Sequence, residues 1–324
     1  MTKRNTTDAR DLTTMPTPDN FNLSSVDNEP SERTKDYVRA SSSEATLRAY
    51  KSDLKHFVAW GGIVPASPEL VANYLAEHAG KLSVSTLSRR VAALSKMHEV
   101  KRFDNPTKTE LVRATMRGVR RKHHVAPKQV SPITRERLIK MLETCEDDDK
   151  GVRDRALLLI GFASALRRSE LVSLDCSHIE LVPEGVILNI VRSKTDQQGE
   201  GRRIGIPYAK GEHCPVKSIK AYMDMAQLIN GPLFRSLGEV GLGEERLADH
   251  GVAYIIKNRA KLADFDPAMF SGHSLRAGFA SSAAQAGAET WSIMKQTGHK
   301  SEATVRRYIR EGELFTTNAM TNIL

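Results

Sequence analysis

Hydrophobic residues recur at helical spacing in four successive segments between residues 41 and 122. In the first segment the apolar positions that share one face are Leu47, Tyr50, Leu54, Phe57 and Val58. The string Ser41-x-x-Glu44 has the form of a capping box, which predicts that this helix begins near Ser41. The next three helices are expected to open at Ser67, Ser85 and Pro106. Four short amphipathic helices predict an all-α bundle within a domain of residues 35–122.

The pattern changes after residue 132. A helix is expected from Thr134 to Glu143, followed by a nearly all-apolar and therefore buried helix from Arg155 to Leu166. Residues 185–191 and 202–207 have strand character and flank a polar turn, which predicts a hairpin. Further helices are predicted at about 216–229, 251–263, 274–287, 289–296 and 301–309. Residues 133–324 therefore form a mostly helical domain with a small antiparallel sheet, and the whole chain is mainly α.

Composition adds a tail and a linker to these two domains. Residues 1–34 hold ten Ser/Thr and three Pro with few large apolar side chains, which predicts a disordered arm. Residues 107–128 hold seven Lys/Arg and one acid, and they are interpreted as a basic connection, with the domain linker itself at 123–132. A basic connector can follow a phosphate backbone, although a merely solvated charged face is the alternative.

Charge and cysteine usage narrow the class of protein. The 48 Lys/Arg against 39 Asp/Glu give a net charge of +9, which favours an anionic partner such as nucleic acid. Three widely separated cysteines fit neither disulfide pairs nor a C-x-x-C metal site, so we expect a cytoplasmic protein without a metal. The longest apolar run is far shorter than the roughly 18 residues of a membrane span, so no membrane partner is expected.

Four local constellations could carry chemistry. Arg167 follows the predicted buried helix and Glu170 stands three residues later, an arrangement that suits either phosphate binding or a structural ion pair. Lys194 lies at the tip of the predicted hairpin, where most lysines are only solvated. His273 and Arg276, three apart at a helix entrance, could bind an anion or could be a capping histidine and a surface arginine.

The last constellation combines Gly298-His299 with Tyr308 nine residues later. A tyrosine on an amphipathic helix is more often a core residue than a nucleophile. The order of the four constellations along the chain, however, closely resembles the tyrosine recombinase (phage integrase) family. The resemblance extends from about residue 41 to the C-terminus and implies a helical core-binding domain followed by a catalytic domain with the DNA breaking-rejoining fold.

The resemblance also implies a role for each residue of the four constellations. Tyr308 matches the nucleophile, Arg167 and Arg276 the phosphate-binding arginines, Lys194 the general acid and Glu170 a supporting acid. His273 and His299 match the two remaining positions of the family's site. The implied reaction is site-specific DNA recombination through a 3′-phosphotyrosyl bond and a Holliday junction, without metal, ATP or another cofactor.

Family membership further implies the partners. These are double-stranded DNA with paired half-sites and a homo-tetramer on two sites, in which the segment 314–324 resembles the tail that docks on a neighbouring protomer; a frayed tail is the alternative. The residues expected to contact DNA are Arg48, Ser52, Arg89, Arg90, Arg117, Arg120, Arg121 and Lys122. Two other functions stay open: a type IB topoisomerase, and a DNA-binding regulator with a decayed site.

Overall fold

The structure is a computed structural model that describes residues 31–41, 43–123, 130–191, 201–238, 241–303, 305, 306 and 308. The chain divides into two compact units, Met1–Pro127 and Lys128–Leu324. This division falls inside the segment 123–132 that the sequence predicts as a linker. We refer to the first part as the N-terminal unit and to the second as the catalytic unit, after the catalytic domain that the family resemblance implies for residues 133–324.

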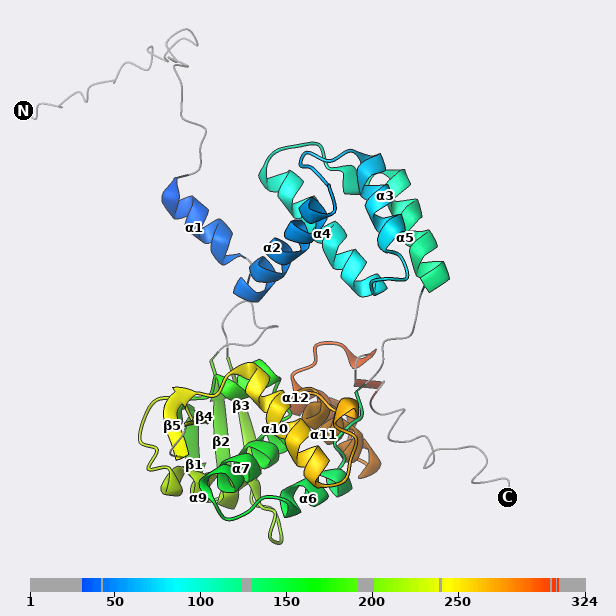
Figure 1. The fold of residues 1–324 in the computed structure, drawn as a ribbon. Coiled ribbons are helices and arrows are strands. Elements are labelled where there is room, and N and C mark those ends of the chain that lie inside the picture. The colour runs from blue at the N-terminus through cyan, green and yellow to red at the C-terminus, as the bar shows by residue number, and fades with distance from the viewer. Residues whose placement is uncertain are drawn as a thin grey trace, which may run out of the picture. The chain divides into compact units, whose positions relative to one another are not determined.

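The N-terminal unit is a bundle of helices (Figure 1). Its elements are α1 (Glu32–Ala40), α2 (Glu44–Ala59), α3 (Pro68–His78), α4 (Val84–Val100), a 3₁₀ turn η2 (Pro106–Lys108) and α5 (Glu110–His123). Helix α3 packs on α5 and α2 packs on α4. The core between them includes Phe57, Tyr74, Leu75, Leu87 and Leu94, each no more than 1% exposed.

Serine residues fix the starts of three of these helices. The hydroxyls of Ser43, Ser67 and Ser83 accept hydrogen bonds from the backbone amides three residues later, at 3.1–3.2 Å. Such caps satisfy backbone donors that the helix itself leaves unpaired. The predicted start at Ser41 was therefore wrong, because Ser43 provides the cap.

Three further expectations for the N-terminal unit need correction. Helix α1 begins at Glu32, inside the arm predicted for residues 1–34, and the remainder of that arm lies outside the described residues. The basic run predicted as a connection is helical as far as His123, because Val112, Met116 and Val119 are buried on one face of α5. Its basic side chains therefore stand on the outer face of a folded helix. Pro106 opens only the short turn η2, and α5 starts at Glu110.

The catalytic unit combines helices with two small sheets (Figure 1). Its helices are α6 (Arg135–Glu143), α7 (Asp149–Ser164), α8 (Arg168–Val172), α9 (Pro215–Met225), α10 (Asp249–Leu262), α11 (Ser274–Gln285) and α12 (Thr290–Thr297). Short 3₁₀ turns, η3 (Cys176–His178) and η4 (Pro267–Met269), join some of them. The described residues among 302–308 are also helical, as predicted for 301–309.

The predicted hairpin is confirmed. Strands β1 (Ile179–Val182), β2 (Gly185–Ile190) and β3 (Arg202–Pro207) form an antiparallel sheet in which Ile190 pairs with Arg202. The sequence did not predict β1 or the separate pair β4 (Arg235–Gly238) and β5 (Gly241–Arg246). The exposed and partly exposed residues of these strands give no clear alternation of apolar and polar positions.

Helix α7 is the central buried element of the catalytic unit. It starts at Asp149, earlier than the predicted Arg155, because the Asp148 carboxylate accepts a 2.6 Å hydrogen bond from the amide of Gly151. It ends at Ser164, and Ala165 takes a left-handed conformation with φ of 50°. No helix among the described residues is long and apolar enough to cross a membrane.

A buried ionic group supports α7 from within. Asp154 is fully buried and pairs with Arg153 at 2.7 Å and with Arg259 of α10 at 2.8 Å. The two guanidiniums also donate to the carbonyls of Arg235 and Thr144. Each polar group in this set has partners, so the charges are tolerated in the core.

We predict that Asp154→Asn destabilises the catalytic unit by about 3–5 kcal/mol, because it leaves two buried guanidiniums without their carboxylate. The measurement is urea unfolding followed by Trp291 fluorescence in a Trp60→Phe background, which leaves one of the two tryptophans of the chain. Glu180→Gln is the control, since Glu180 pairs with Arg203 at the surface and should cost no more than about 1 kcal/mol. Equal effects of the two substitutions would contradict the prediction.

Candidate active site and nucleic-acid interface

Arg167 and Glu170 are brought together at the start of α8. The Arg167 amide donates to one carboxylate oxygen of Glu170 at 3.0 Å, and its guanidinium donates to the other at 2.6 Å. Glu170 is 4% exposed, whereas the Arg167 side chain keeps 18% of its surface exposed. The carboxylate therefore both caps the helix and orients a guanidinium that is still accessible to a ligand.

Arg276 of α11 lies deeper in the same cluster. It is 4% exposed, and its Nη1 donates to the carbonyl of Ala165 at 2.7 Å. The left-handed residue Ala165 thus ends α7 and also provides the carbonyl that accepts a hydrogen bond from Arg276. Nη2 of Arg276 is buried and has no hydrogen-bond partner among the described residues.

The charge on Arg276 depends on its neighbours. Burial lowers the pKa of Arg276 to about 10, and the positive charges of Arg167 and Arg202 act in the same direction. Glu170 and Tyr308 act in the opposite direction. The Arg276 guanidinium therefore stays protonated at neutral pH. Because Arg167, Glu170, Arg202 and Tyr308 all affect the pKa of Arg276, these five side chains form one electrostatic cluster although they are far apart in the sequence.

His299 and Tyr308 form the other side of the candidate site. Their rings stack with centroids 6.1 Å apart and an interplanar angle of 24°. Tyr308 is half-buried against the small apolar cluster of Ala280, Ala284, Ile293 and Val305. Tyr308, which matches the family's nucleophile, and His299, which matches its histidine-or-tryptophan position, are therefore neighbours.

The contact between His299 and Thr297 favours one tautomer of the imidazole ring. Nδ1 lies 2.9 Å from Oγ1 of Thr297, and the Thr297 hydroxyl donates its hydrogen to the carbonyl of Ile293 at 2.7 Å. The hydroxyl oxygen must then accept from Nδ1–H, so in the neutral ring the lone pair is on Nε2. That nitrogen is the one able to accept a proton.

The two remaining predicted residues have different outcomes. His273 is exposed at the start of α11, immediately before Ser274. Its carbonyl accepts from the amide of Ala277 at 3.0 Å, while the ring is on the accessible side of the helix entrance. Lys194 lies outside the described residues.

Arg202 at the start of β3 belongs to the cluster and was missed in the sequence. Its Nη2 lies 3.5 Å from Glu170 Oε2, and burial lowers its pKa. The overlooked signal is the alternation of β3, in which Arg202 shares a face with the buried Ile204 and Ile206. An arginine on the inward face of a strand needs an internal partner, here Glu170.

Among the described residues no group of three or more His, Cys, Asp and Glu side chains could hold a metal ion. The cationic groups available in the described cluster are instead arginines. Three guanidiniums, those of Arg167, Arg202 and Arg276, face one carboxylate, that of Glu170. The cluster therefore has an excess of two positive charges, which suits an anionic ligand.

The predicted DNA-contacting residues of α5 share an exposed basic surface. Arg117, Arg120 and Arg121 line a hollow with Ala114 and Gly118, and Lys122 is exposed on the same helix. Arg117 also pairs with Glu110, and Arg120 donates to the hydroxyl of Ser88 at 3.3 Å.

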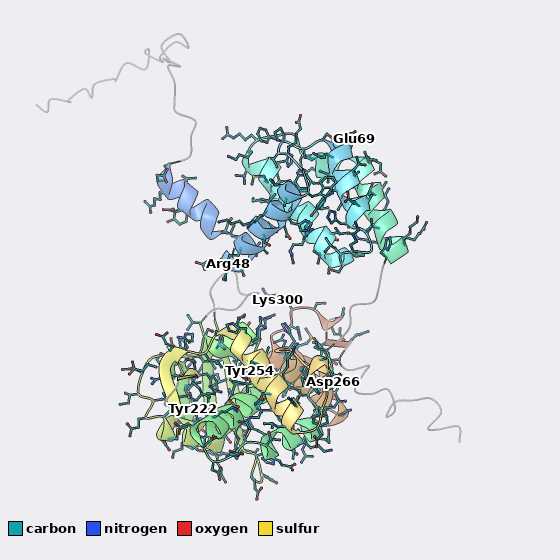
Figure 2. The ribbon with its side chains drawn as sticks, in the orientation of Figure 1. Arg48, Glu69, Tyr222, Tyr254, Asp266 and Lys300 are labelled. Carbon is teal, nitrogen blue, oxygen red and sulfur yellow. The ribbon has the colours of Figure 1, made fainter. Side chains whose placement is uncertain are left out.

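Helix α2 exposes Arg48, labelled in Figure 2, and also Ser52 one turn later. Arg89 of α4 is half-exposed and binds the Asp53 carboxylate with two hydrogen bonds of 2.7 and 2.9 Å. Its guanidinium is thereby held at the surface in a fixed orientation.

Arg90 is placed differently from the other predicted DNA contacts. It is 8% exposed, and Nη1 lies 2.6 Å from the Tyr74 hydroxyl and 2.8 Å from Nδ1 of His56. Burial lowers the pKa of His56, with a further contribution from Arg90, which favours the neutral ring. This internal network argues against a direct contact between Arg90 and DNA.

Comparison with known proteins identifies the family to which this arrangement belongs. Residues 132–313 match the phage integrase family and residues 35–102 match its N-terminal SAM-like domain. The chain belongs to the phage integrase family. Within it the chain is a tyrosine site-specific recombinase of the XerD/XerC-like kind.

Curated relatives and solved structures agree with this membership. An integrase/recombinase XerD homolog of Selenomonas ruminantium is 42% identical over 295 residues, 87% of this chain and 86% of the relative. The tyrosine recombinase XerC of Thermodesulfovibrio yellowstonii is 27% identical over 280 residues, 82% of this chain and 85% of the relative.

Two solved structures share the fold. XerH site-specific recombinase bound to palindromic difH substrate gives a TM-score of 0.59 at 18% identity, covering 79% of this chain and 72% of that chain. The Tn1549 transposon integrase in complex with transposon right end DNA gives 0.61 at 15% identity, covering 88% and 97%.

We predict that Arg276→Met changes the free energy of unfolding by no more than about 1 kcal/mol, or raises it. Replacing a buried, incompletely paired charge by an apolar side chain of similar length is often neutral or stabilising. Cleavage of DNA should nevertheless fall about 100- to 1000-fold, because a donor to the transition state is lost. Urea unfolding and single-turnover cleavage of the same variant provide the measurement.

Arg259→Met is the matched control, since Arg259 is equally buried but fully paired with Asp154. Arg259→Met should lower the free energy of unfolding, whereas the cleavage rate of the folded protein should not fall specifically. A large loss of stability in Arg276→Met would show that its charge serves the fold.

Proposed function

We propose that this recombinase cleaves and rejoins DNA through a 3′-phosphotyrosyl bond formed by Tyr308 and exchanges strands through a Holliday junction. The observation that carries the proposal is the clustering of Arg167, Glu170, Arg276, His299 and Tyr308, which are supplied by separate segments of the catalytic unit. The proposed substrate is double-stranded DNA with paired half-sites.

Arginines suit the phosphoryl-transfer step for an electrostatic reason. A phosphodiester carries one negative charge, and attack on phosphorus places more charge on its non-bridging oxygens. Arg167 and Arg276 offer fixed donors in a largely water-excluded site, and His273 adds another donor at the helix entrance. The orphaned Nη2 of Arg276 is the donor that a bound phosphate oxygen would satisfy.

Tyr308 requires activation, since a phenol of pKa about 10 is ionised in only about one molecule in a thousand at pH 7. Nε2 of His299 accepts the phenolic proton as the Tyr308 oxygen bonds to phosphorus. The bond from phosphorus to the 5′ oxygen breaks, and Lys194 donates the proton that completes the 5′ hydroxyl. Religation by a partner strand's 5′ hydroxyl reverses these steps and releases Tyr308.

The same scheme requires neither metal nor ATP. The arginines provide the positive charge that a metal ion would otherwise supply, and the phosphotyrosyl bond conserves the energy needed for religation. The sequence contains no Gly-x-x-x-x-Gly-Lys-Ser/Thr loop.

We infer a homo-tetramer on two DNA sites, in which segment 314–324 docks on a neighbouring protomer. The strings Ser271-Gly-His-Ser-Leu-Arg276 and Arg307-Tyr-Ile-Arg310 look most like those of Cre recombinase, a single-chain enzyme of the family. Cre has tryptophan at the position of His299, so the proton-accepting role proposed here for His299 is a difference from Cre. XerH was solved bound to palindromic difH substrate and the Tn1549 integrase in complex with transposon right end DNA, and these complexes support a DNA partner for this chain.

Two other functions would use parts of the same arrangement. A type IB topoisomerase would form the tyrosyl adduct but relax DNA without exchanging strands. A catalytically silent regulator would bind its site and form no adduct. Arg167, Glu170, Arg276, His299 and Tyr308 are chemically competent side chains in contact or in electrostatic range of one another, which favours the recombinase.

We predict that wild-type protein forms a covalent adduct with a nicked duplex in EDTA and that Tyr308→Phe forms none. The duplex is first obtained by selection for binding, and adducts are resolved on a denaturing gel. The released fragment should carry a free 5′ hydroxyl, because the tyrosine takes the 3′ phosphate. Products with exchanged flanks from two labelled duplexes then separate recombination from simple relaxation.

Tyr208→Phe is the control, since Tyr208 is a half-exposed tyrosine outside the cluster and should leave adduct formation unchanged. A requirement for added magnesium would contradict the arginine-only scheme. Specific binding without an adduct from the wild type would favour the regulator.

We predict that Arg121→Gln weakens binding to all DNA sequences alike and reduces the slope of log Kd against log salt by about one. The reason is that an exposed arginine of α5 neutralises one phosphate without reading a base. Lys217→Gln is the control: it removes the same charge from α9, outside both the basic surface and the arginine cluster. A loss confined to one base position would show that Arg121 reads sequence.

A further inference from the structure

Arg202 connects two parts of the catalytic unit that the other residues of the cluster leave separate. On one side its Nη2 lies 3.5 Å from the Glu170 carboxylate, which also holds Arg167. On the other side its Nη1 donates to the backbone carbonyl of Gln296 at 3.4 Å, in the last turn of α12. The guanidinium therefore spans from the phosphate-binding residues to the turn that precedes His299.

The end of α12 is shaped to admit this guanidinium. Gly298 has φ of 66° and closes the helix, and a β-carbon at this position would overlap Nη1 of Arg202. Glycine thus serves two purposes here, a left-handed backbone and room for the arginine. The residue immediately after it is His299.

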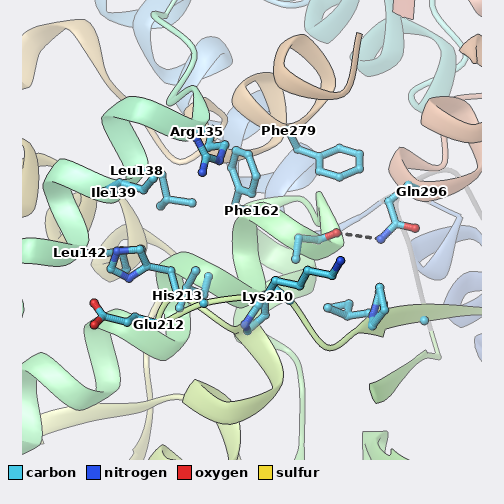
Figure 3. A pocket seen from close by; sticks show the side chains of 18 residues that line it. Arg135, Leu138, Ile139, Leu142, Phe162, Lys210, Glu212, His213, Phe279 and Gln296 are labelled. Atoms are coloured by element: carbon cyan, nitrogen blue, oxygen red, sulfur yellow. Dashed lines mark hydrogen bonds between the residues drawn. The ribbon is translucent and has the colours of Figure 1, made fainter. Parts of the chain in front are cut away.

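Gln296 is fixed from its other side as well. Its side-chain amide donates to the carbonyl of Ala163 at 2.7 Å, the dashed contact in Figure 3. Ala163 lies near the end of α7, two residues before the carbonyl that receives Arg276. The turn that carries His299 is therefore tied to both α7 and β3.

The ionic environment of Arg202 is unusual for a purely structural arginine. Its Nε and Nη2 are buried without a hydrogen bond among the residues that the structure describes. The fully paired arginines of the Asp154 group show how this unit satisfies guanidiniums that serve only the fold. A buried donor without a hydrogen-bond partner lowers the stability of the folded protein. The presence of such donors on Arg202 therefore indicates a role other than stabilising the fold.

We propose that Arg202 is a positioning residue that sets the His299–Tyr308 segment relative to the phosphate bound by Arg167 and Arg276. The inference rests on the proposed function, because it takes Tyr308 as the nucleophile. Arg202 does not itself exchange protons or bonds with the substrate. It acts by fixing the carbonyl of Gln296 and the turn at Gly298 against Glu170.

The test measures single-turnover adduct formation at saturating duplex for Arg202→Gln, together with its Kd for the duplex and its urea unfolding. We expect the cleavage rate to fall about 100-fold, the cost typical of a small misplacement of reacting groups. The Kd should change less than about threefold, and stability should be unchanged or raised. Parallel losses of stability and rate would instead indicate a structural role and overturn the inference.

Arg203→Gln is the matched control. Arg203 is the next residue of β3, points to the opposite face and pairs with Glu180 at the surface, with 64% of its side chain exposed. It removes the same charge from the same strand and should leave the rate unchanged. A loss in Arg203→Gln equal to that in Arg202→Gln would show that only net charge matters.

Gly298→Ala supplies an independent arm through a double-mutant cycle. In the wild-type background it should slow cleavage strongly, because the new methyl group displaces the guanidinium and strains a positive φ. In the Arg202→Gln background only the backbone strain should remain, so the two effects should be less than additive. Additive effects would overturn the proposed link.

A duplex with a 5′-bridging phosphorothiolate separates positioning from proton donation, because its thiolate leaving group needs no proton. The substrate should leave the Arg202→Gln defect in place, and restoration to the wild-type rate would assign Arg202 to leaving-group protonation instead. Absence of any adduct from wild type would overturn the proposed function and this inference together. Equal adduct rates for wild type and Arg202→Gln would overturn this inference alone.

Discussion

The pairing of Glu170 with the surrounding arginines is the interaction on which the candidate site depends. One buried carboxylate orients Arg167, caps α8 and pairs with Arg202, while Arg276 lies within its electrostatic range. The single negative charge of Glu170 cannot balance three guanidiniums, so the cluster has an excess positive charge that an anion would neutralise. Without Glu170 the three positive charges would repel one another in a poorly solvated space.

The contrast with the Asp154 group shows that this imbalance is a property of the site and not of the fold in general. Asp154 holds Arg153 and Arg259, and backbone carbonyls take up further donors of both guanidiniums. In the catalytic cluster, by comparison, buried nitrogens of Arg202 and Arg276 have no hydrogen-bond partner among the described residues. The same unit thus contains a satisfied ionic group that stabilises α7 and an unsatisfied one whose buried donors are left for the proposed anionic ligand.

The sequence predicted the parts that follow from periodicity and from local motifs. The bundle helices, the hairpin β2–β3 and the helix entrances at His273 and His299 could be found because the apolar spacing and the glycines are local signals. Arg276 lies near Arg167 because its guanidinium donates to the carbonyl of Ala165. This is a tertiary contact between residues far apart in the sequence, so no local sequence pattern predicts it. The sequence predicts Arg90 as a DNA contact, since the helical periodicity of α4 does not show that Tyr74 and His56 lie against that face. The sequence did not predict β1, β4 and β5 because none of their residues is fully buried, so they lack the alternation of apolar and polar positions that marks a half-buried strand.

The packing around Tyr308, the proposed nucleophile, explains why a polar connection is needed beside it. The rings of His299 and Tyr308 stack on each other, and Tyr308 packs on a small cluster made mostly of alanine, isoleucine and valine side chains. Such small side chains bury little apolar area, so their packing alone contributes modest free energy to the placement of the phenol. The main core, by contrast, fixes α7 and with it Ala163 and Ala165. Contacts from Gln296 to Ala163 and from Arg202 to Gln296 therefore extend the rigidity of the main core to the His299 turn. In the proposed reaction, the placement of Tyr308 then depends on the same carboxylate that orients Arg167, so Glu170 would couple the nucleophile to the phosphate-binding residues.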